Sequence, residues 1–179
     1  MFLSGKKIIK IAITGPESTG KSLLSERLAA HYRTLWVPEY ARVYIDRLNR
    51  PYTRDDILKI ARGQLRSEHR LQRDVSRFLF CDTELIVTKI WSEFKYGTCD
   101  PWILEQIEKN RYDLYLLCYI DLPWEDDPQR EHPHLREELF NLYLQEMTER
   151  NLPFRVISGK GPQRLKCSVA IIDECFGIG

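Results

Sequence analysis

The sequence predicts an α/β fold in which a five-stranded, mostly parallel sheet carries helices on both faces. Short runs rich in β-branched and aromatic residues alternate with longer helical patterns along the whole chain. These runs are almost continuously apolar, as expected for strands that are covered on both faces. The length of 179 residues suits one core, so we expect a single domain over residues 1–179.

Each element has a local justification. The apolar runs predict strands at residues 7–14, 34–39, 77–82, 113–120 and 154–158. Helical patterns predict helices at about Ser22–Tyr32, Tyr40–Leu48, Asp55–Arg77, Thr83–Tyr96, Pro101–Asn110, His134–Asn151 and Pro162–Phe176. Thr53 is a plausible N-cap with Asp56 three residues later, Gly97 follows a helix end, and Pro101 suits a first turn.

The overall composition excludes several classes of protein. The formal net charge is +1 at pH 7, which argues against a protein that acts mainly on nucleic acid or an anionic membrane. The N-terminal apolar run is too short to span a bilayer and lacks a cleavage pattern, so we expect a cytoplasmic protein. The five cysteines form no CxxC pair, and we interpret them as reduced and mostly structural.

The segment "GPESTGKS" has the Walker A pattern of a phosphate-binding loop, because it follows a strand and opens a helix. Lys21 is expected to bridge the β- and γ-phosphates of ATP or GTP, and Ser22 to ligate Mg²⁺. The structural alternative is a glycine-rich turn between a strand and a helix, in which the lysine has no role in phosphate binding. The predicted nucleotide-binding residues are Gly15, Pro16, Glu17, Ser18, Thr19, Gly20, Lys21, Ser22 and Leu23.

Two carboxylates that follow strands are candidates for the chemistry. Asp82 ends the run "RFLFCD" and could reach the Mg²⁺ shell, although an aspartate there could equally be a helix N-cap. Glu39 in "VPEYAR" could accept a proton from an acceptor hydroxyl, with Arg42 steadying charge. The structural alternative for Glu39 is a capping residue at the start of a helix.

The polar run from Asp121 to Glu137 is predicted to be a lid. A kinase must exclude water from the reacting phosphate, and Arg130 and Arg136 could close onto that phosphate. The alternative is a solvated loop whose arginines pair with its own acidic residues. We interpret His132 and His134 as loop residues and not as metal ligands.

The longest predicted helix has two different faces. Gln64 and Glu68 fall on its apolar side, where they could line a ligand pocket or form a satisfied core pair. Its arginine stripe is interpreted as a solvated face, with a nucleic-acid or subunit contact as the alternative; the stripe comprises Arg62, Arg66, Arg70, Arg73 and Arg77.

Several aromatic residues lie near predicted loop ends. They could stack on a nucleoside-like acceptor or simply pack in the core. These residues are Trp91, Phe94, Tyr96, Trp102 and Trp124.

The sequence closely resembles the nicotinamide riboside kinase domain of NadR-type bacterial proteins. The resemblance rests on "GPESTGKS", "VPEYAR", "CDTELIVTKIWSEFKYG", "RYDLYLLCYIDLPWEDDPQREHP" and "FRVISGKGPQRL". It implies a P-loop kinase fold with a lid, and Mg-ATP-dependent phosphorylation of the ribose 5′-hydroxyl of nicotinamide riboside. The product would be nicotinamide mononucleotide, used in NAD synthesis. A kinase for another nucleoside, and a regulatory NTP-binding module, remain the alternatives.

The resemblance also suggests roles for individual residues. It implies that Glu39 and Asp82 are the acceptor-side and metal-side carboxylates, that Arg130 and Arg136 belong to the lid, and that Gly159 and Gly161 lie beside adenine. Trp91 and Trp124 become candidates to stack on the nicotinamide ring, and Asp121 a candidate to contact the ribose hydroxyls or the ring charge. The adenylyltransferase and helix-turn-helix motifs of some family members do not occur in this sequence, so the kinase step is the expected activity. A homo-oligomer is possible.

Overall fold

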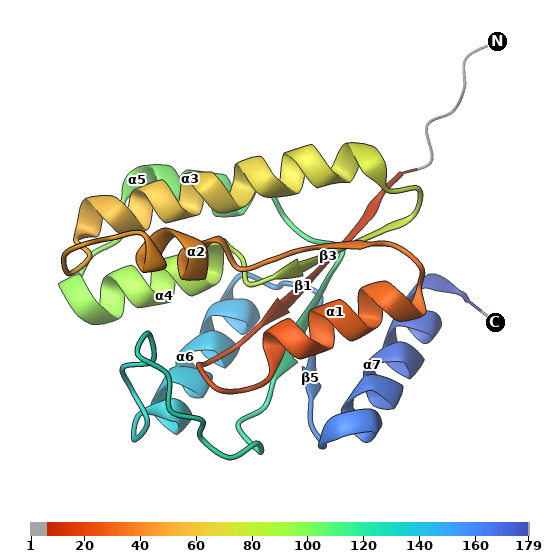
Figure 1. Ribbon diagram of the computed structural model, residues 1–179. Coiled ribbons are helices and arrows are strands. Elements are labelled where there is room, and N and C mark those ends of the chain that lie inside the picture. The colour runs from red at the N-terminus through yellow and green to blue at the C-terminus, as the bar shows by residue number, and fades with distance from the viewer. Residues whose placement is uncertain (1–6, 179) are drawn as a thin grey trace, which may run out of the picture.

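The computed structural model describes residues 7–178 and shows one five-stranded sheet (Figure 1). The strand order is β2-β3-β1-β4-β5, and all neighbouring strands are parallel. The predicted α/β fold is therefore confirmed. The strands are β1 Ile9–Thr14, β2 Leu35–Val37, β3 Phe78–Asp82, β4 Leu114–Cys118 and β5 Phe154–Ile157.

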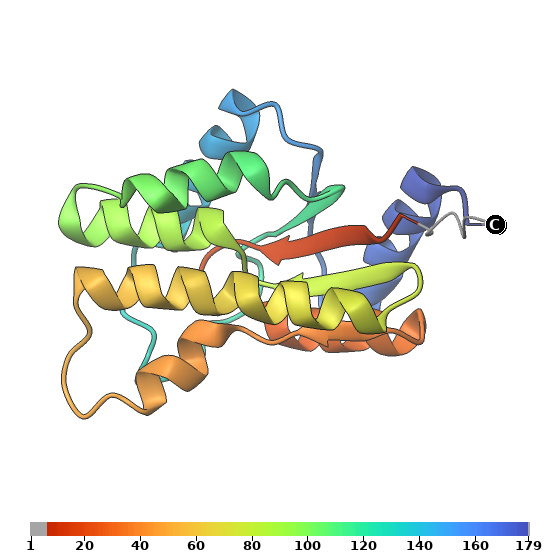
Figure 2. The same cartoon turned by 90° about the horizontal axis from the view of Figure 1, so that it is seen from above.

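The helices form a layer on each face of the sheet, as the view from above shows (Figure 2). They are α1 Lys21–His31, α2 Tyr40–Asp46, α3 Arg54–Leu71, α4 Leu85–Tyr96, α5 Pro101–Lys109, α6 Arg136–Glu149 and α7 Gly161–Phe176, with a 3₁₀ turn η1 at Gln72–Asp74. Side chains of α3, α4, α5 and α6 pack on one face, and those of α1 and α7 pack on the other.

The central strands explain why the sequence lacks a clear alternation of polar and apolar residues. Every residue of β3 and β4 is buried, because alternate side chains enter the two opposite cores. In β1, Ile11 and Ile13 pack towards α1 and α7, whereas Ala12 packs on the other face. Because all five strands are parallel, their carboxyl ends meet at one edge of the sheet, where a site can form.

Several predicted boundaries differ from the observed ones, and three of the differences have a clear local reason. The strand predicted at residues 34–39 ends at Val37, because Pro38 has no N–H to donate to a neighbouring strand. The helix predicted to run to Arg77 ends at Leu71 and tightens into η1 before the chain turns into β3. The helix predicted from Thr83 begins at Leu85, because Thr83 adopts a left-handed conformation with φ of 65°.

The predicted helix signals are confirmed. Thr53 and Asp56 form a reciprocal capping box at the start of α3, and Gly97 ends α4 in the left-handed conformation. Pro101 occupies the first turn of α5. Within residues 7–178, no helix combines the length and hydrophobicity needed to cross a bilayer.

Candidate active site

A cavity of about 580 Å³ lies at the carboxyl edge of the sheet. Its floor is the loop from Gly15 to Leu23, and its walls come from the start of α2, from α4, from α6 and from the lid segment, residues 121–137. Of the predicted residues outside that loop, those that line the cavity are Glu39, Arg42, Trp91, Phe94 and Arg130. The structure therefore brings residues from distant parts of the sequence to one cavity.

The phosphate-binding loop depends on glycine at its first position. Gly15 has φ of 126°, and a Cβ atom there would lie only 2.9 Å from the carbonyl oxygen of Cys118. Gly20, with φ of 74°, precedes α1, so the positive end of that helix faces the loop. The ammonium of Lys21 donates to the carbonyl oxygen of Pro16 at 2.7 Å and stays at the loop. This geometry suits the binding of nucleotide phosphates.

Asp82 has a buried carboxylate with no hydrogen-bond partner among residues 7–178. Its side chain is 1% exposed, and neither carboxylate oxygen accepts a hydrogen bond from the described residues. Burial, followed by the charge of Glu39, raises its pKa to about 6, while the Ser22 hydroxyl and the Lys21 charge act in the opposite direction. Unsatisfied anionic oxygens beside a serine hydroxyl suit Mg²⁺, which binds oxygen ligands and keeps some of its own waters.

The helix-capping interpretation does not apply to Asp82. The N-cap of α4 is Glu84, whose carboxylate accepts a hydrogen bond from the backbone N–H of Ile86 at 2.6 Å. Glu84 also accepts a hydrogen bond from the Thr14 hydroxyl, at the end of β1. Asp82 therefore has no capping function; it is the last residue of β3, directly before the turn that leads to α4.

Glu39 occupies the N-cap position of α2, but its side chain makes no capping hydrogen bond there. The side chain lines the cavity, and its charge is one of the causes that raise the pKa of Asp82. Arg42, one turn into α2, donates to the carboxylate of Asp127 at 2.8 Å. Arg42 thus connects α2 to the lid segment.

The lid segment is hydrogen-bonded to the phosphate-binding loop. Ser18 Oγ accepts hydrogen bonds from the backbone N–H of Glu125 at 2.8 Å and from Arg130 at 3.2 Å. Glu17 accepts hydrogen bonds from the backbone N–H groups of Glu131 and His132. The lid segment therefore lies against the first part of the loop, whereas Ser22 and Leu23 at the end of the loop are exposed.

The two predicted lid arginines face the loop in different ways. Arg130 contacts Ser18 and also lies 3.5 Å from a carboxylate oxygen of Glu125, so both interpretations of this residue hold in part. Arg136 donates to the backbone carbonyls of Leu122 and Ser18. The Nε of Arg136 is buried and has no hydrogen-bond partner among residues 7–178.

One part of the cavity wall is aromatic. Tyr52 and Trp91 contact each other edge to face with ring centroids 4.8 Å apart, and the indole N–H of Trp91 donates to the Tyr52 hydroxyl at 2.9 Å. Phe94 and His132 pack in the same manner, with centroids 5.1 Å apart. Aromatic side chains of this kind can bind a flat ring of a ligand by stacking on it.

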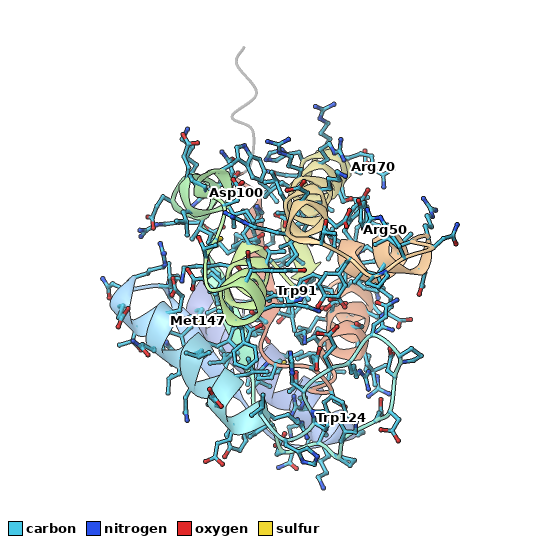
Figure 3. The ribbon with its side chains drawn as sticks, turned by 90° about the vertical axis from the view of Figure 1, so that its left-hand side faces the viewer. Arg50, Arg70, Trp91, Asp100, Trp124 and Met147 are labelled. Atoms are coloured by element: carbon cyan, nitrogen blue, oxygen red, sulfur yellow. The ribbon has the colours of Figure 1, made fainter. Side chains whose placement is uncertain are left out.

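Figure 3 shows Trp91 near the middle of this side of the molecule and Trp124 near its lower edge. Trp124 lies outside the cavity wall, and its indole N–H donates to Asp126 within the lid segment. Of the other aromatic residues, Tyr96 donates to the backbone of Tyr52, and Trp102 lies under the Arg62 guanidinium.

Asp121 also lies outside the cavity. Its carboxylate accepts a hydrogen bond from the backbone N–H of Gly159 at 2.6 Å and pairs with Arg164. Arg164 is 4% exposed and donates to the carbonyl oxygen of Thr19 at 2.8 Å. Arg164 also donates to the carbonyl oxygen of Gly159 and so connects that turn to the phosphate-binding loop, while neither Gly159 nor Gly161 lines the cavity.

One polar residue of α3, Glu68, belongs to the core, whereas the arginines of this helix are exposed. Glu68 is fully buried, lies 2.8 Å from the Lys10 ammonium and accepts a hydrogen bond from the Tyr112 hydroxyl, so its contacts are with core residues and not with the cavity. The predicted arginine stripe is exposed, and Figure 3 shows Arg70 projecting from α3. Arg77 lies beyond the end of α3, because the helix is shorter than predicted.

Sequence reasoning missed several residues of the site. Tyr52 and Lys95 meet Glu131 of the lid segment, and the Tyr52 hydroxyl donates to that carboxylate at 2.9 Å. These residues are far apart in the sequence, and no local pattern connects them. Arg164 was also missed, although it lies within the "FRVISGKGPQRL" block.

Comparison with known proteins supports the family resemblance. A protein-family model described as an AAA domain matches residues 10–164. The trifunctional NAD biosynthesis/regulator protein NadR of Escherichia coli K12 is 29% identical over 176 residues, which is 93% of this chain and 42% of NadR. NadR of Salmonella typhimurium is 29% identical over 152 residues, covering 80% of this chain and 37% of that protein. The chain thus spans less than half the length of these curated relatives.

Solved structures with the same fold include two enzymes and a NadR protein. A NadR protein in complex with NR has a TM-score of 0.78 at 22% identity, over 96% of this chain and 52% of that one. Thymidylate kinase from Ehrlichia chaffeensis has a TM-score of 0.66 at 12% identity, over 92% and 98% of the two chains. Deoxyadenosine kinase from M. mycoides has a TM-score of 0.63 at 13% identity, over 93% and 100%. The chain belongs to the AAA domain family and is a P-loop domain homologous to NadR.

Proposed function

We propose that this protein is an ATP-dependent kinase that transfers the γ-phosphate to the ribose 5′-hydroxyl of nicotinamide riboside. The product would be nicotinamide mononucleotide. One observation carries the proposal: the phosphate-binding loop and a group of aromatic side chains line the same cavity. Homology to NadR, and the NR bound to a NadR protein of the same fold, support nicotinamide riboside as the acceptor.

The residues of the site fit the parts that such a transfer needs. Lys21 would hold the phosphates, and Ser22 and Asp82 would hold Mg²⁺, which neutralises phosphate charge when bound. Glu39 would accept the proton of the acceptor hydroxyl, because its carboxylate lines the cavity without a capping hydrogen bond. Trp91 would stack on the nicotinamide ring, and the loop at Gly159 and Gly161 would lie beside adenine.

The lid segment would exclude water from the transfer. It is fastened both to the phosphate-binding loop and to α2, so a bound nucleotide would be covered. Arg42, Arg130 and Arg136 would stabilise the charge that spreads over the γ-phosphoryl oxygens. Exclusion of water favours phosphorylation of the acceptor over hydrolysis.

A panel of nucleosides incubated with Mg-ATP tests this proposal. Mass spectrometry should show a gain of one phosphate for nicotinamide riboside, at a higher rate than for adenosine, cytidine, thymidine or uridine. Faster phosphorylation of another nucleoside would assign a different acceptor to the kinase. ADP release without any phosphorylated nucleoside would contradict the proposal.

Replacing Arg130 with alanine should lower kcat about 100-fold or more and change the KM for the nucleoside much less. The reason is that the charge that Arg130 faces develops in the transition state. Steady-state kinetics with varied nucleoside measure both constants. Arg155→Ala is the matched control, because Arg155 is exposed on β5 and its guanidinium donates to the adjacent backbone carbonyl. A defect confined to KM would show that Arg130 only helps the acceptor to bind.

A further inference from the structure

Helix α2 needs external contacts to hold its position. It has seven residues and none of them is buried. So short a helix is not stable on its own, and packing of an apolar face normally fixes a helix in place. The residue at its N-cap is Glu39, whose carboxylate lines the cavity. Whatever fixes the first turn of α2 therefore also fixes Glu39.

Two adjacent residues of α3 contact this first turn, in addition to the bond between Arg42 and Asp127 of the lid segment. The ring of Tyr40 lies directly over Gly63, where a Cβ atom would come within 2.0 Å of the Tyr40 Cε1. The backbone N–H of Tyr40 donates to the side-chain oxygen of Gln64 at 3.0 Å. Gly63 thus leaves room for the ring, and Gln64 binds the free N–H at the start of α2. We call these two residues the socket.

Gln64 also reaches the loop that carries the second carboxylate. Its side-chain nitrogen donates to the carbonyl oxygens of Asp82 at 3.5 Å and Thr83 at 3.4 Å. Thr83 has φ of 65°, a conformation that a β-branched residue adopts only when its surroundings impose it. Gln64 is 4% exposed, and all three of these partners are backbone groups.

The two carboxylates that Gln64 connects through the backbone repel each other. Like charges on the two turns that Gln64 joins would tend to separate those turns. A neutral side chain that binds both turns opposes this separation without adding charge. An amide can do so, because it has a donor and an acceptor.

We propose that Gly63 and Gln64 are positioning residues, which hold Tyr40 in the socket and fix Glu39 relative to Asp82 for phosphoryl transfer. This inference rests on the proposed function. It replaces the sequence-based expectation that Gln64 contacts the substrate, because the amide is already engaged by three backbone groups. A displacement of about 1 Å at a reacting group can cost about 100-fold in rate.

A double-mutant cycle tests whether Gln64 acts through Glu39. Gln64→Leu removes both hydrogen-bonding atoms at similar size, and should lower kcat at least about 10-fold with the KM for ATP unchanged. In a Glu39→Gln background, the same substitution should have little further effect, because the group that it positions has already been lost. A wild-type kcat in Gln64→Leu, or an equal fold-loss in both backgrounds, would overturn the inference.

A substitution at Gly63 tests the other half of the socket. Glycine to alanine usually stabilises a helix interior, but Gly63→Ala should lower kcat because the new methyl group displaces Tyr40. Tyr40→Ala combined with Gly63→Ala should be no worse than Tyr40→Ala alone, since no ring remains to be displaced. If Gly63→Ala reduces kcat equally with and without the Tyr40 ring, the socket is refuted.

Hydrogen exchange tests the socket independently of the reaction. In Gln64→Leu, the amides of residues 39–46 should exchange faster, whereas those of β1 should keep their wild-type rates. This result would support the socket even if the wild-type protein phosphorylated no nucleoside, an outcome that would defeat the proposed function and the catalytic part of the inference. Unchanged exchange in residues 39–46 would overturn the socket itself.

Discussion

Lys21→Ala should reduce phosphoryl transfer at least about 1,000-fold while the protein stays folded. Lys21 is the first residue of α1, and its ammonium lies at the phosphate-binding loop, 2.7 Å from the carbonyl oxygen of Pro16. Its positive charge would meet the β- and γ-phosphates, where charge grows during transfer. The side chain belongs to no apolar core cluster, so its removal should not open a cavity in the core.

Turnover of Mg-ATP with nicotinamide riboside, together with thermal unfolding, measures both parts of this prediction. Lys166→Ala on α7 is the matched control, because Lys166 is exposed and lies outside the cavity. The control should keep wild-type turnover and unfolding temperature. Full transfer by Lys21→Ala would refute the role given to this lysine.

Asp82→Asn should remove nearly all Mg²⁺-dependent turnover and should stabilise the protein in the absence of metal. Loss of the carboxylate removes the charged group that would bind Mg²⁺ beside Ser22. The same carboxylate is buried without a hydrogen-bond partner among the described residues, so its ionised form costs stability. Activity and stability should therefore change in opposite directions.

The stability gain has a defined pH dependence. Folding raises the pKa of Asp82 from 3.8 to about 6, so its contribution to stability is full below about pH 4 and is lost as the pH rises through about 6. Asp82→Asn should accordingly be more stable than wild type by about 3 kcal/mol at pH 8, and equal to it near pH 4. Urea unfolding in EDTA at the two pH values measures this difference. A less stable variant at pH 8 would show that Asp82 has a stabilising partner.

The sequence was informative wherever neighbouring residues determine the structure. The strands could be predicted because β-branched runs between turns are local signals, and the phosphate-binding loop because its glycines and lysine have fixed spacing. Helix ends were predicted well where a cap exists, as at Thr53 and Gly97. The end of α3 was missed, because the arginine pattern continues after the helix has stopped.

The sequence was less informative about contacts between distant segments. Trp91 and Trp124 looked like equal candidates for a stacking role, yet only Trp91 lies at the cavity, because α4 and the lid segment follow different paths. Asp121 looked like a substrate ligand, and its pairing with Arg164 depends on where α7 packs. The contact between Tyr52 and Glu131 likewise forms only after α3, α4 and the lid segment have assembled.

The central claim is that a nucleotide held at the phosphate-binding loop gives its terminal phosphate to nicotinamide riboside inside the covered cavity. The most direct test measures ADP, free phosphate and nicotinamide mononucleotide in one reaction with Mg-ATP. We predict one nicotinamide mononucleotide for each ADP, with almost no free phosphate. ADP and free phosphate formed in equal amounts, at a rate that does not depend on nicotinamide riboside, would contradict the claim.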